Sequence, residues 1–462
     1  MFNKIQNYLL INHPLLWNTK IVPALVAGVL FNIIFFLLGY SEGTVYFKDN
    51  DYYYDGNSAS IIFFSVLISI LFFVVWIVYY TRNNAYKSFY QLQKFALYKE
   101  WLIILAICML NVNYTLSYLT GKEVRVRTYF SYEETKKRCE TIGMASVFID
   151  GGHYTPSANS NEPRTLVFNG QEYPVGSLIN NSGQTFRISG NENPELKVKK
   201  LMQQDNQQQI KKIMRDYFAL IKEHGLNTNL TPEQWFDMTY SHPHFTDYEL
   251  IGKGNGNNDG LGYTAGSYTY NLPHNALVNG YQRISNSWFS PLIEDSTILF
   301  TLYFGLAISM LVFGYKVTTG RNLLIAVISF GLLWILFGIM AVLSSSGKFI
   351  PYACLILVVA MMAYFLSVIN SNEGKRVSGI VLNILLWSLG AVLPIIYCLL
   401  MDYYSNTDQG IRDGGYIYSK VPQYEWLLEH LSDFTFLNIL FIALFMLYMT
   451  ENVRKWKGTA ES

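Results

Sequence analysis

Ionisable side chains are scarce in this chain, and eight long stretches lack them altogether. Charged residues make up 15% of the 462 residues, well below the ~25% that is typical of soluble domains. The formal net charge is only +1, so no strong overall field would attract nucleic acid, and no such partner is expected. The stretches without Asp, Glu, Lys, Arg or His are residues 21–40, 59–80, 101–119, 297–315, 322–343, 349–369, 377–401 and 434–450.

Each of these stretches is close to the ~20 apolar residues that a helix needs to cross the hydrocarbon layer. The sequence therefore predicts an α-helical polytopic membrane protein with about eight transmembrane helices, and the lipid bilayer is its first expected partner. One long polar segment divides the spans into three and five. We expect an N-terminal membrane part (1–119), an extracytoplasmic domain (120–296) and a C-terminal membrane part (297–462).

Cysteine is also rare, with four residues in the whole chain. Cys139 is the only one between residues 120 and 296, so this domain cannot close an internal disulfide. A segment of this size can hold a hydrophobic core without one.

The basic residues of the short loops predict the orientation of the chain. If the N-terminus is cytoplasmic, 13 Lys and Arg residues fall on the inner side and four on the outer side. The four outer residues are Lys48, Lys348, Arg412 and Lys420. An even number of spans then puts both termini in the cytoplasm and the polar domain outside.

The polar domain is predicted to be mixed α/β. Apolar and basic residues alternate over 124–130, the pattern of a half-buried strand, and short apolar segments suggest further strands. The further strand candidates are 145–149, 165–168 and 185–188.

Helices in this domain are indicated by capping residues and periodicity. Ser131 and Glu134 form a capping box that should start a helix running to about Gly143. Residues 195–224 have an apolar face, and Thr231 followed by Pro232 should start another helix. The predicted core face of 195–224 consists of Ile210, Met214, Tyr217 and Ile221. A short helix is also expected at 422–429, before the last span.

Two polar segments contain side chains that can bind metal ions. Residues 255–260 resemble the start of a calcium loop, but Gly266 occupies the position that needs a bidentate acid. The second group is His242, His244, Asp247, Glu249 and His274. Pro243 prevents a helical spacing of its histidines. We therefore expect solvated loops here, with metal sites as the alternative.

The predicted spans carry no group suited to proton transfer, and no ATPase signature occurs in the chain. We therefore expect no enzymatic activity, no catalytic residues and no cofactor. The polar residues of the spans, Asn32, Asn111, Asn113 and Asn383, should instead form hydrogen bonds between helices. Pro23 and Pro394 are expected to kink their spans.

Two segments on the predicted cytoplasmic side have helical apolar faces. Residues 2–11 are typical of a short helix on the inner leaflet. Residues 81–99 place Ala85, Phe89, Leu92 and Ala96 in one stripe. Such a helix binds lipid or a partner protein, and the sequence does not decide between them.

The order of elements over residues 1–119 resembles the permease subunits of type-2 ABC exporters. It consists of an inner-leaflet helix, a span, a short outer loop, a second span, an amphipathic segment and a third span. The segments 12–20 and 98–105 also resemble bacterial polytopic proteins of such export systems. Members of this family usually have six spans and no large domain after the third, so this chain departs from the pattern.

The resemblance implies a permease-like or permease-associated subunit in a bacterial inner membrane, driven by a separate cytoplasmic ATPase. The stripe of Ala85, Phe89, Leu92 and Ala96 would be the coupling segment that contacts this ATPase. The extracytoplasmic domain would gate, receive cargo or hold a periplasmic protein partner. The alternative is a non-transporting scaffold or sensor whose spans only anchor the domain.

Overall fold

The computed structural model places most of the chain in two compact units. It describes residues 4, 7–8, 11–12, 20–47, 56–82, 94–149, 165–168, 171–174, 184–189, 193–240, 251–252, 270–289, 291–343, 349–371, 375–405, 410–412, 415–417 and 422–458. The membrane unit comprises residues 1–35, 62–117 and 294–462, and the polar unit comprises residues 36–61 and 118–293. The predicted helix at 2–11 lies largely outside the described residues.

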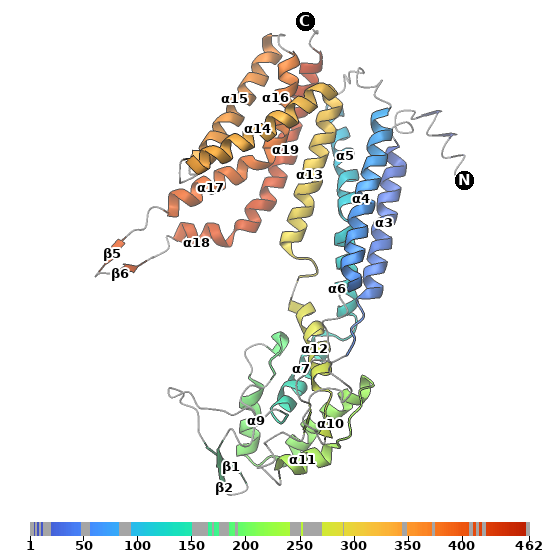
Figure 1. The fold of residues 1–462 in the computed structure, drawn as a ribbon, viewed down its shortest axis with the longest axis vertical. Helices are drawn as coiled ribbons and strands as arrows, with labels where there is room; N and C mark the ends of the chain where they lie inside the picture. Colours follow the sequence, from blue (N-terminus) through green and yellow to red (C-terminus); the bar gives the residue numbers. More distant parts are fainter. Residues whose placement is uncertain are drawn as a thin grey trace. The chain divides into compact units, whose positions relative to one another are not determined.

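Long helices account for all eight stretches that lack ionisable residues (Figure 1). Within the described part of the chain, seven helices are long and apolar enough to cross a membrane, or eight if a bent pair counts as one span. The unbroken ones are α3 (Ile21–Glu42), α4 (Gly56–Arg82), α13 (Asp295–Val317), α14 (Gly320–Leu343), α15 (Phe349–Ser371) and α19 (Leu431–Gly458). The chain is therefore a mostly helical, multi-pass membrane protein.

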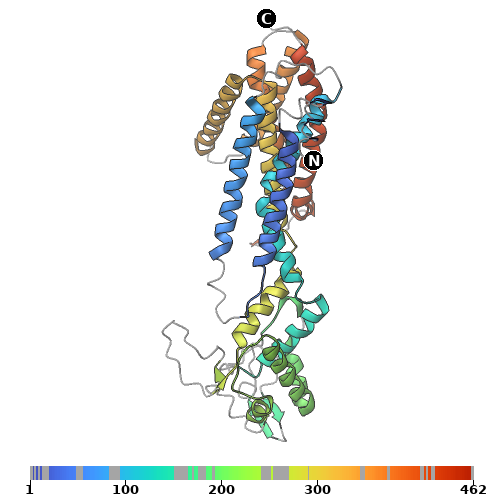
Figure 2. The same ribbon diagram turned by 90° about the vertical axis from the view of Figure 1, so that its right-hand side faces the viewer.

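The third span is bent. It consists of α5 (Ala96–Val112) and α6 (Tyr114–Arg127), whose axes differ by 52°. The Tyr114 hydroxyl donates to Oδ1 of Asn111 at 2.6 Å, and Nδ2 of Asn111 donates to the Ile107 carbonyl at 2.7 Å. These bonds satisfy polar groups at the bend, where water is scarce. Figure 2 shows α5 running alongside α13, the helix it contacts most extensively.

The seventh span is broken in its middle. A short 3₁₀ segment, η5 (Leu389–Ala391), separates α16 (Lys375–Ser388) from α17 (Val392–Ser405). Pro394, which was expected to kink this span, lies in the first turn of α17, where its missing N–H costs no helix bond. Asn438 of α19 donates to the Gly390 carbonyl at 2.8 Å, which satisfies a backbone group at the break.

A small hairpin and a short helix connect α17 to α19. The hairpin pairs β5 (Gly410–Arg412) antiparallel to β6 (Gly415–Ile417). The helix is α18 (Pro422–Glu429), which confirms the prediction at 422–429.

The described part of the polar unit is built mainly from helices, so the structure does not support the prediction of a mixed α/β domain. Its described helices are α7 (Tyr132–Ser146), α9 (Pro194–Gln203), α10 (Gln207–Glu223), α11 (Pro232–Tyr240), α12 (His274–Phe289) and the 3₁₀ segment η3 (Arg187–Ser189). Its described strands are two isolated pairs: β1 (Thr165–Phe168) is antiparallel to β2 (Gln171–Pro174), and β3 (Ile251–Gly252) is parallel to β4 (Tyr270–Asn271). The core is formed by apolar faces of the helices.

Most of the predicted strands are helical or irregular instead. Residues 124–127 belong to α6, 145–149 form the end of α7 and a following turn, and 185–188 run into η3. Only the strand at 165–168 is confirmed. Alternation over a few residues does not distinguish a strand from the end of a helix that continues from a neighbouring span.

The helix predictions for this domain are more accurate. The Ser131 side chain accepts from the Glu134 amide at the start of α7. Thr231 accepts from the Gln234 amide, and the Gln234 side chain accepts in return. All four predicted core residues of α10, Ile210, Met214, Tyr217 and Ile221, are buried. The predicted helix 195–224 is interrupted near Asp205, whose φ is 49°.

Glycines allow α3 and α6 to cross in close contact within the polar unit. A Cβ on Gly39 would overlap the Tyr118 carbonyl, and one on Gly121 would overlap the Phe36 carbonyl. Gly43 faces the Lys122 carbonyl in the same way. The spacing of Gly39 and Gly43 is the small-xxx-small pattern that lets helix backbones touch. The Tyr118 hydroxyl adds a 2.6 Å hydrogen bond to Glu42 of α3.

Candidate functional site

The predicted coupling segment lies between α4 and α5. Ala85, Phe89 and Leu92 fall outside the described residues, and their role stays a prediction. Ala96 is half-buried in the first turn of α5. It follows Phe95, whose φ is 65°, so α5 does not continue backward as one helix through Phe95. The ends of the predicted helix 81–99 therefore belong to α4 and α5.

The helix ends that flank this segment meet in a charged cluster. Glu100 of α5 and Lys316 of α13 form an ion pair, and the Tyr80 hydroxyl of α4 donates to Glu100 at 3.3 Å. The Glu100 and Lys316 side chains are only 16% and 19% exposed. A sheltered ion pair thus joins α5 to the sequence-distant α13, and a hydrogen bond adds the neighbouring helix α4. We name Tyr80, Glu100 and Lys316 the helix-end cluster.

Aromatic side chains pack around the helix-end cluster and extend its contacts. Trp76 stands against Tyr80 with ring centroids 5.2 Å apart, and Trp101 is fully buried. The Tyr98 hydroxyl donates to the Ala443 carbonyl of α19 at 3.2 Å. The first turns of α5 are therefore fixed to both α13 and α19.

Asparagines provide further contacts between the membrane helices. Asn32 of α3 donates to the Leu110 carbonyl at 2.7 Å and accepts from Ser117 at 2.6 Å. Asn383 of α16 donates to Thr318 at 2.9 Å. These bonds confirm that Asn32 and Asn383 link helices. Asn111, by contrast, bonds within α5 and to Tyr114.

Asn438 of α19, which sequence reasoning did not single out, links its helix to two further elements, α13 and η5. Its Nδ2 donates to the Tyr303 hydroxyl of α13 at 2.7 Å as well as to Gly390. The sequence did contain a signal for this contact, because Asn438 is an isolated polar residue in the apolar stretch 434–450.

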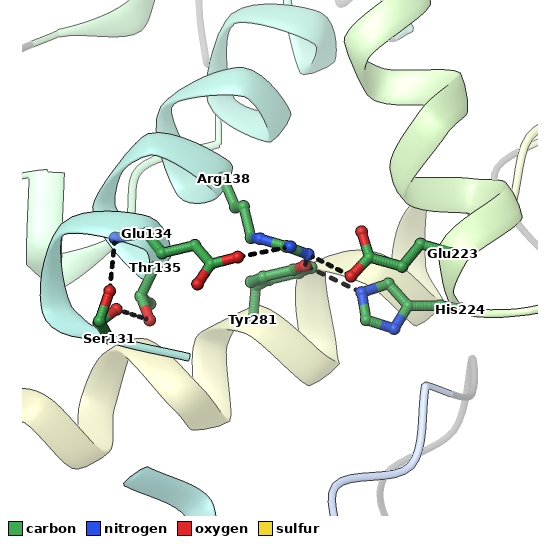
Figure 3. A network of polar contacts seen from close by, with 7 residues as sticks. All are labelled: Ser131, Glu134, Thr135, Arg138, Glu223, His224 and Tyr281. Atoms are coloured by element: carbon green, nitrogen blue, oxygen red, sulfur yellow. Dashed lines mark hydrogen bonds and ion pairs between the residues drawn. The ribbon is translucent and has the colours of Figure 1, made fainter. Parts of the chain in front are cut away.

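The polar unit contains a second charged network, centred on Arg138 of α7 (Figure 3). Its guanidinium donates to Glu134 at 2.7 Å, to Glu223 at 2.8 Å and to the Tyr281 hydroxyl at 3.0 Å. The Arg138 guanidinium carbon also lies 3.9 Å from the Phe130 ring centroid, a cation–π distance. One side chain thereby joins α7, α10 and α12. Sequence reasoning missed it because the partners are 85 and 143 residues away.

The Tyr281 hydroxyl connects Arg138 to a histidine. A guanidinium can only donate, so the Tyr281 oxygen accepts from Arg138, and this hydroxyl also forms a hydrogen bond with Nε2 of His224, 2.8 Å away. Burial holds the pKa of His224 below its ordinary value. The negative charge of Glu223 raises this pKa, and the positive charge of Arg138 lowers it further. Burial alone would lower the pKa of Arg138, but its hydrogen bonds raise it above the ordinary value.

Phe47, five residues after the end of α3, contacts the same network. Its ring stacks on His224 with centroids 3.6 Å apart and lies 5.5 Å from Tyr281. A Cβ on Gly280 would overlap the Phe47 ring, so any larger residue there would displace this ring. The chain leaving the first span is thereby attached to the core of the polar unit.

Of the residues considered as metal ligands, only His274 lies in the part of the chain that the structure describes. His242, His244, Asp247, Glu249 and residues 255–260 lie outside the described residues. His274 is buried and its Nδ1 lies 3.1 Å from the Tyr217 hydroxyl. Among the residues that the structure describes, no three His, Cys, Asp or Glu side chains gather as metal ligands.

Comparison with known proteins gives no relative: no family model, no curated protein and no solved structure matches this chain. Function is therefore inferred from the residues and their contacts.

Proposed function

We propose that this chain is a permease-like or permease-associated subunit of an ABC-type export system, driven by a separate cytoplasmic ATPase. The observation that supports it best is the helix-end cluster. Glu100 lies at the start of α5, directly after the segment that would contact the ATPase, and it is paired with Lys316 of α13. A push on this segment would therefore move the C-terminal helices together with α5. ATP hydrolysis itself would belong to the partner.

The proposal places both termini and residues 81–99 in the cytoplasm of a bacterial cell, and residues 120–296 outside the inner membrane. The excess of basic residues in the predicted inner loops supports this orientation. A single cysteine introduced at Asn257, in a variant lacking the native cysteines, should react with an impermeant thiol reagent in intact cells. One at Ser462 should react only after lysis. The opposite pattern would overturn the orientation.

The coupling segment gives the sharpest test of the exporter function. Changing both Phe89 and Leu92 to Asp would place two charges against an apolar groove of the ATPase. A few buried apolar side chains usually carry most of the energy of an interface. We expect the double variant to lose the ATPase on co-purification in mild detergent, while it still inserts into the membrane at the wild-type level.

The matched control changes Tyr90 and Gln91 to Asp, because these residues lie on the opposite side of the predicted helix from the stripe. It adds the same two charges near the lipid surface and should retain the ATPase. If wild type binds no ATPase even after crosslinking, or if the Phe89/Leu92 variant binds it fully, the exporter proposal is wrong.

The second candidate function is a non-transporting scaffold or sensor that presents the polar unit. The attachment of Phe47 to His224 and Tyr281 favours it, because this contact ties the chain after α3 to the core of that unit. In this case a periplasmic protein would be the main partner. Recovery of such a protein without any ATPase would favour the scaffold over the exporter.

A further inference from the structure

The polar unit carries a partly exposed aromatic surface at the ends of two helices, in which Trp288 is half-buried against the core. Trp288 and Phe289 are the last residues of α12, and Tyr132 is the first residue of α7. The Tyr132 and Trp288 rings meet edge to face at 6.0 Å. Phe289, Leu292 and Tyr132 are 43%, 39% and 39% exposed. We name Tyr132, Trp288, Phe289 and Leu292 the aromatic rim.

Two arginines accompany the aromatic rim. The Arg127 guanidinium carbon lies 5.8 Å from the Trp288 ring centroid, and Nε of Arg127 donates to the Ser287 carbonyl at 2.8 Å. Arg187, which is exposed, lies 5.9 Å from the Phe289 ring centroid. Glu294 and Asp295 follow directly in the chain, so these two acidic residues balance the charge of the two arginines. We therefore expect the aromatic side chains to provide most of the contact with a partner surface. The two arginines would favour a partner surface that carries negative charge.

The aromatic rim is close in sequence to two candidate membrane spans, and this closeness limits which surface can cover it. Leu292 is three residues before Asp295, where the candidate span α13 begins, and three residues reach at most about 11 Å. Tyr132 is five residues after Arg127, where the bent candidate span of α5 and α6 ends. Both sides of the aromatic rim are thus tethered to membrane-spanning helices. Tryptophan, tyrosine and arginine are also the residues that anchor proteins at the headgroup level.

We propose that the aromatic rim of the polar unit docks on the headgroup region of the bilayer, with Arg127 and Arg187 facing the phosphodiester groups of anionic phospholipids. Phe289 and Leu292 enter the lipid boundary, and Trp288 with Tyr132 lies at its level. This docking restricts the polar unit whether or not the chain exports a substrate, so it does not depend on the proposed ATPase partner.

Fluorescence quenching in lipid nanodiscs tests the docking with the full chain. A single cysteine at Phe289 or Leu292, in a variant lacking the native cysteines, carries an environment-sensitive dye. The nanodiscs contain phosphatidylcholine alone or mixed with phosphatidylglycerol, together with a lipid bearing a nitroxide near the headgroup or deep in the acyl chain. We expect severalfold stronger quenching by the shallow nitroxide than by the deep one. Phosphatidylglycerol should increase the quenching by the shallow nitroxide, and Arg187→Gln should remove that increase.

The control is Leu196 of α9, an equally exposed leucine of the same unit (47%). A dye at this position should be quenched little by either nitroxide. Size-exclusion profiles identify the labelled samples that are folded. Because two positions, Phe289 and Leu292, are labelled separately, the test still works if one of the two variants misfolds. If folded samples labelled at 289 and 292 are quenched no more than those labelled at 196, the rim does not dock. Shallow quenching that is equal in both lipids would remove the role of the arginines and contradict the proposal as stated.

Discussion

Replacing Gly39 by alanine should destabilise the protein severely, although it adds only one methyl group. The new Cβ would overlap the Tyr118 carbonyl of α6. This obstacle is backbone, so it cannot move aside by a change of rotamer, and α3 and α6 must separate. Overpacking of this kind costs about 1–3 kcal/mol and more where backbone has to shift. We expect a cost at or above the upper value, measured as a lower thermal unfolding midpoint of the purified protein in detergent.

The control is Gly331→Ala on α14, where no heavy atom lies within 4 Å of the new Cβ. Its midpoint should stay at the wild-type value or rise slightly, since alanine favours helix more than glycine does. Gly121→Ala should reproduce the loss seen for Gly39→Ala. The combined variant should lose less than the sum, because both changes separate the same two helices. A wild-type midpoint for Gly39→Ala would show that the helices do not cross in contact there.

The membrane helices were predictable because a single physical requirement, about twenty residues without charge, determines them. Even so, the bend at Asn113 was not predicted, and the break at Leu389–Ala391 was predicted only as a kink at Pro394, a few residues later. Both depend on side chains that satisfy the freed backbone, and Asn438 lies 48 residues from the Gly390 carbonyl that it binds. Local composition cannot identify such a partner.

The polar unit was predicted less well for a related reason. The alternation at 124–130 fits a strand by itself, but the α3 crossing at Gly121 and the hydrogen bonds of α6 favour a continued helix. Tertiary contacts override short patterns of this kind. The 3.6-residue periodicity of α10 covers several turns, and the structure buries all four of its predicted core residues. Longer patterns are therefore the more reliable guide.

The helix-end cluster was not predicted from the sequence. Glu100 and Lys316 each lie directly beside an apolar stretch, where they read as ordinary loop charges. The predicted topology puts both on the cytoplasmic side, which is consistent with a pair. Only the packing of α5 against α13 reveals the ion pair itself.

Removing one member of this pair should have a large effect, and removing both should have a small one. Lys316→Met takes the ammonium away from Glu100, whose carboxylate is only 16% exposed beside the membrane helices. Breaking a buried pair from one side costs roughly 3–5 kcal/mol, because the remaining charge loses its compensation. We expect Lys316→Met and Glu100→Gln each to lower the unfolding midpoint strongly in detergent.

The double variant Glu100→Gln/Lys316→Met should recover most of this loss, because replacing a whole buried pair by uncharged groups is often close to neutral. The control is Arg215→Met on the polar unit, since the Arg215 and Glu233 side chains are 62% and 63% exposed. Such an exposed pair contributes at most about 1 kcal/mol. A double variant that loses the sum of the single losses would show that Glu100 and Lys316 act separately. The ATP hydrolysis rate of the proposed ATPase partner can be measured with the same double variant. If the double variant regains stability but this rate stays below the wild-type rate, the ion pair transmits motion from the coupling segment in addition to holding α5 against α13.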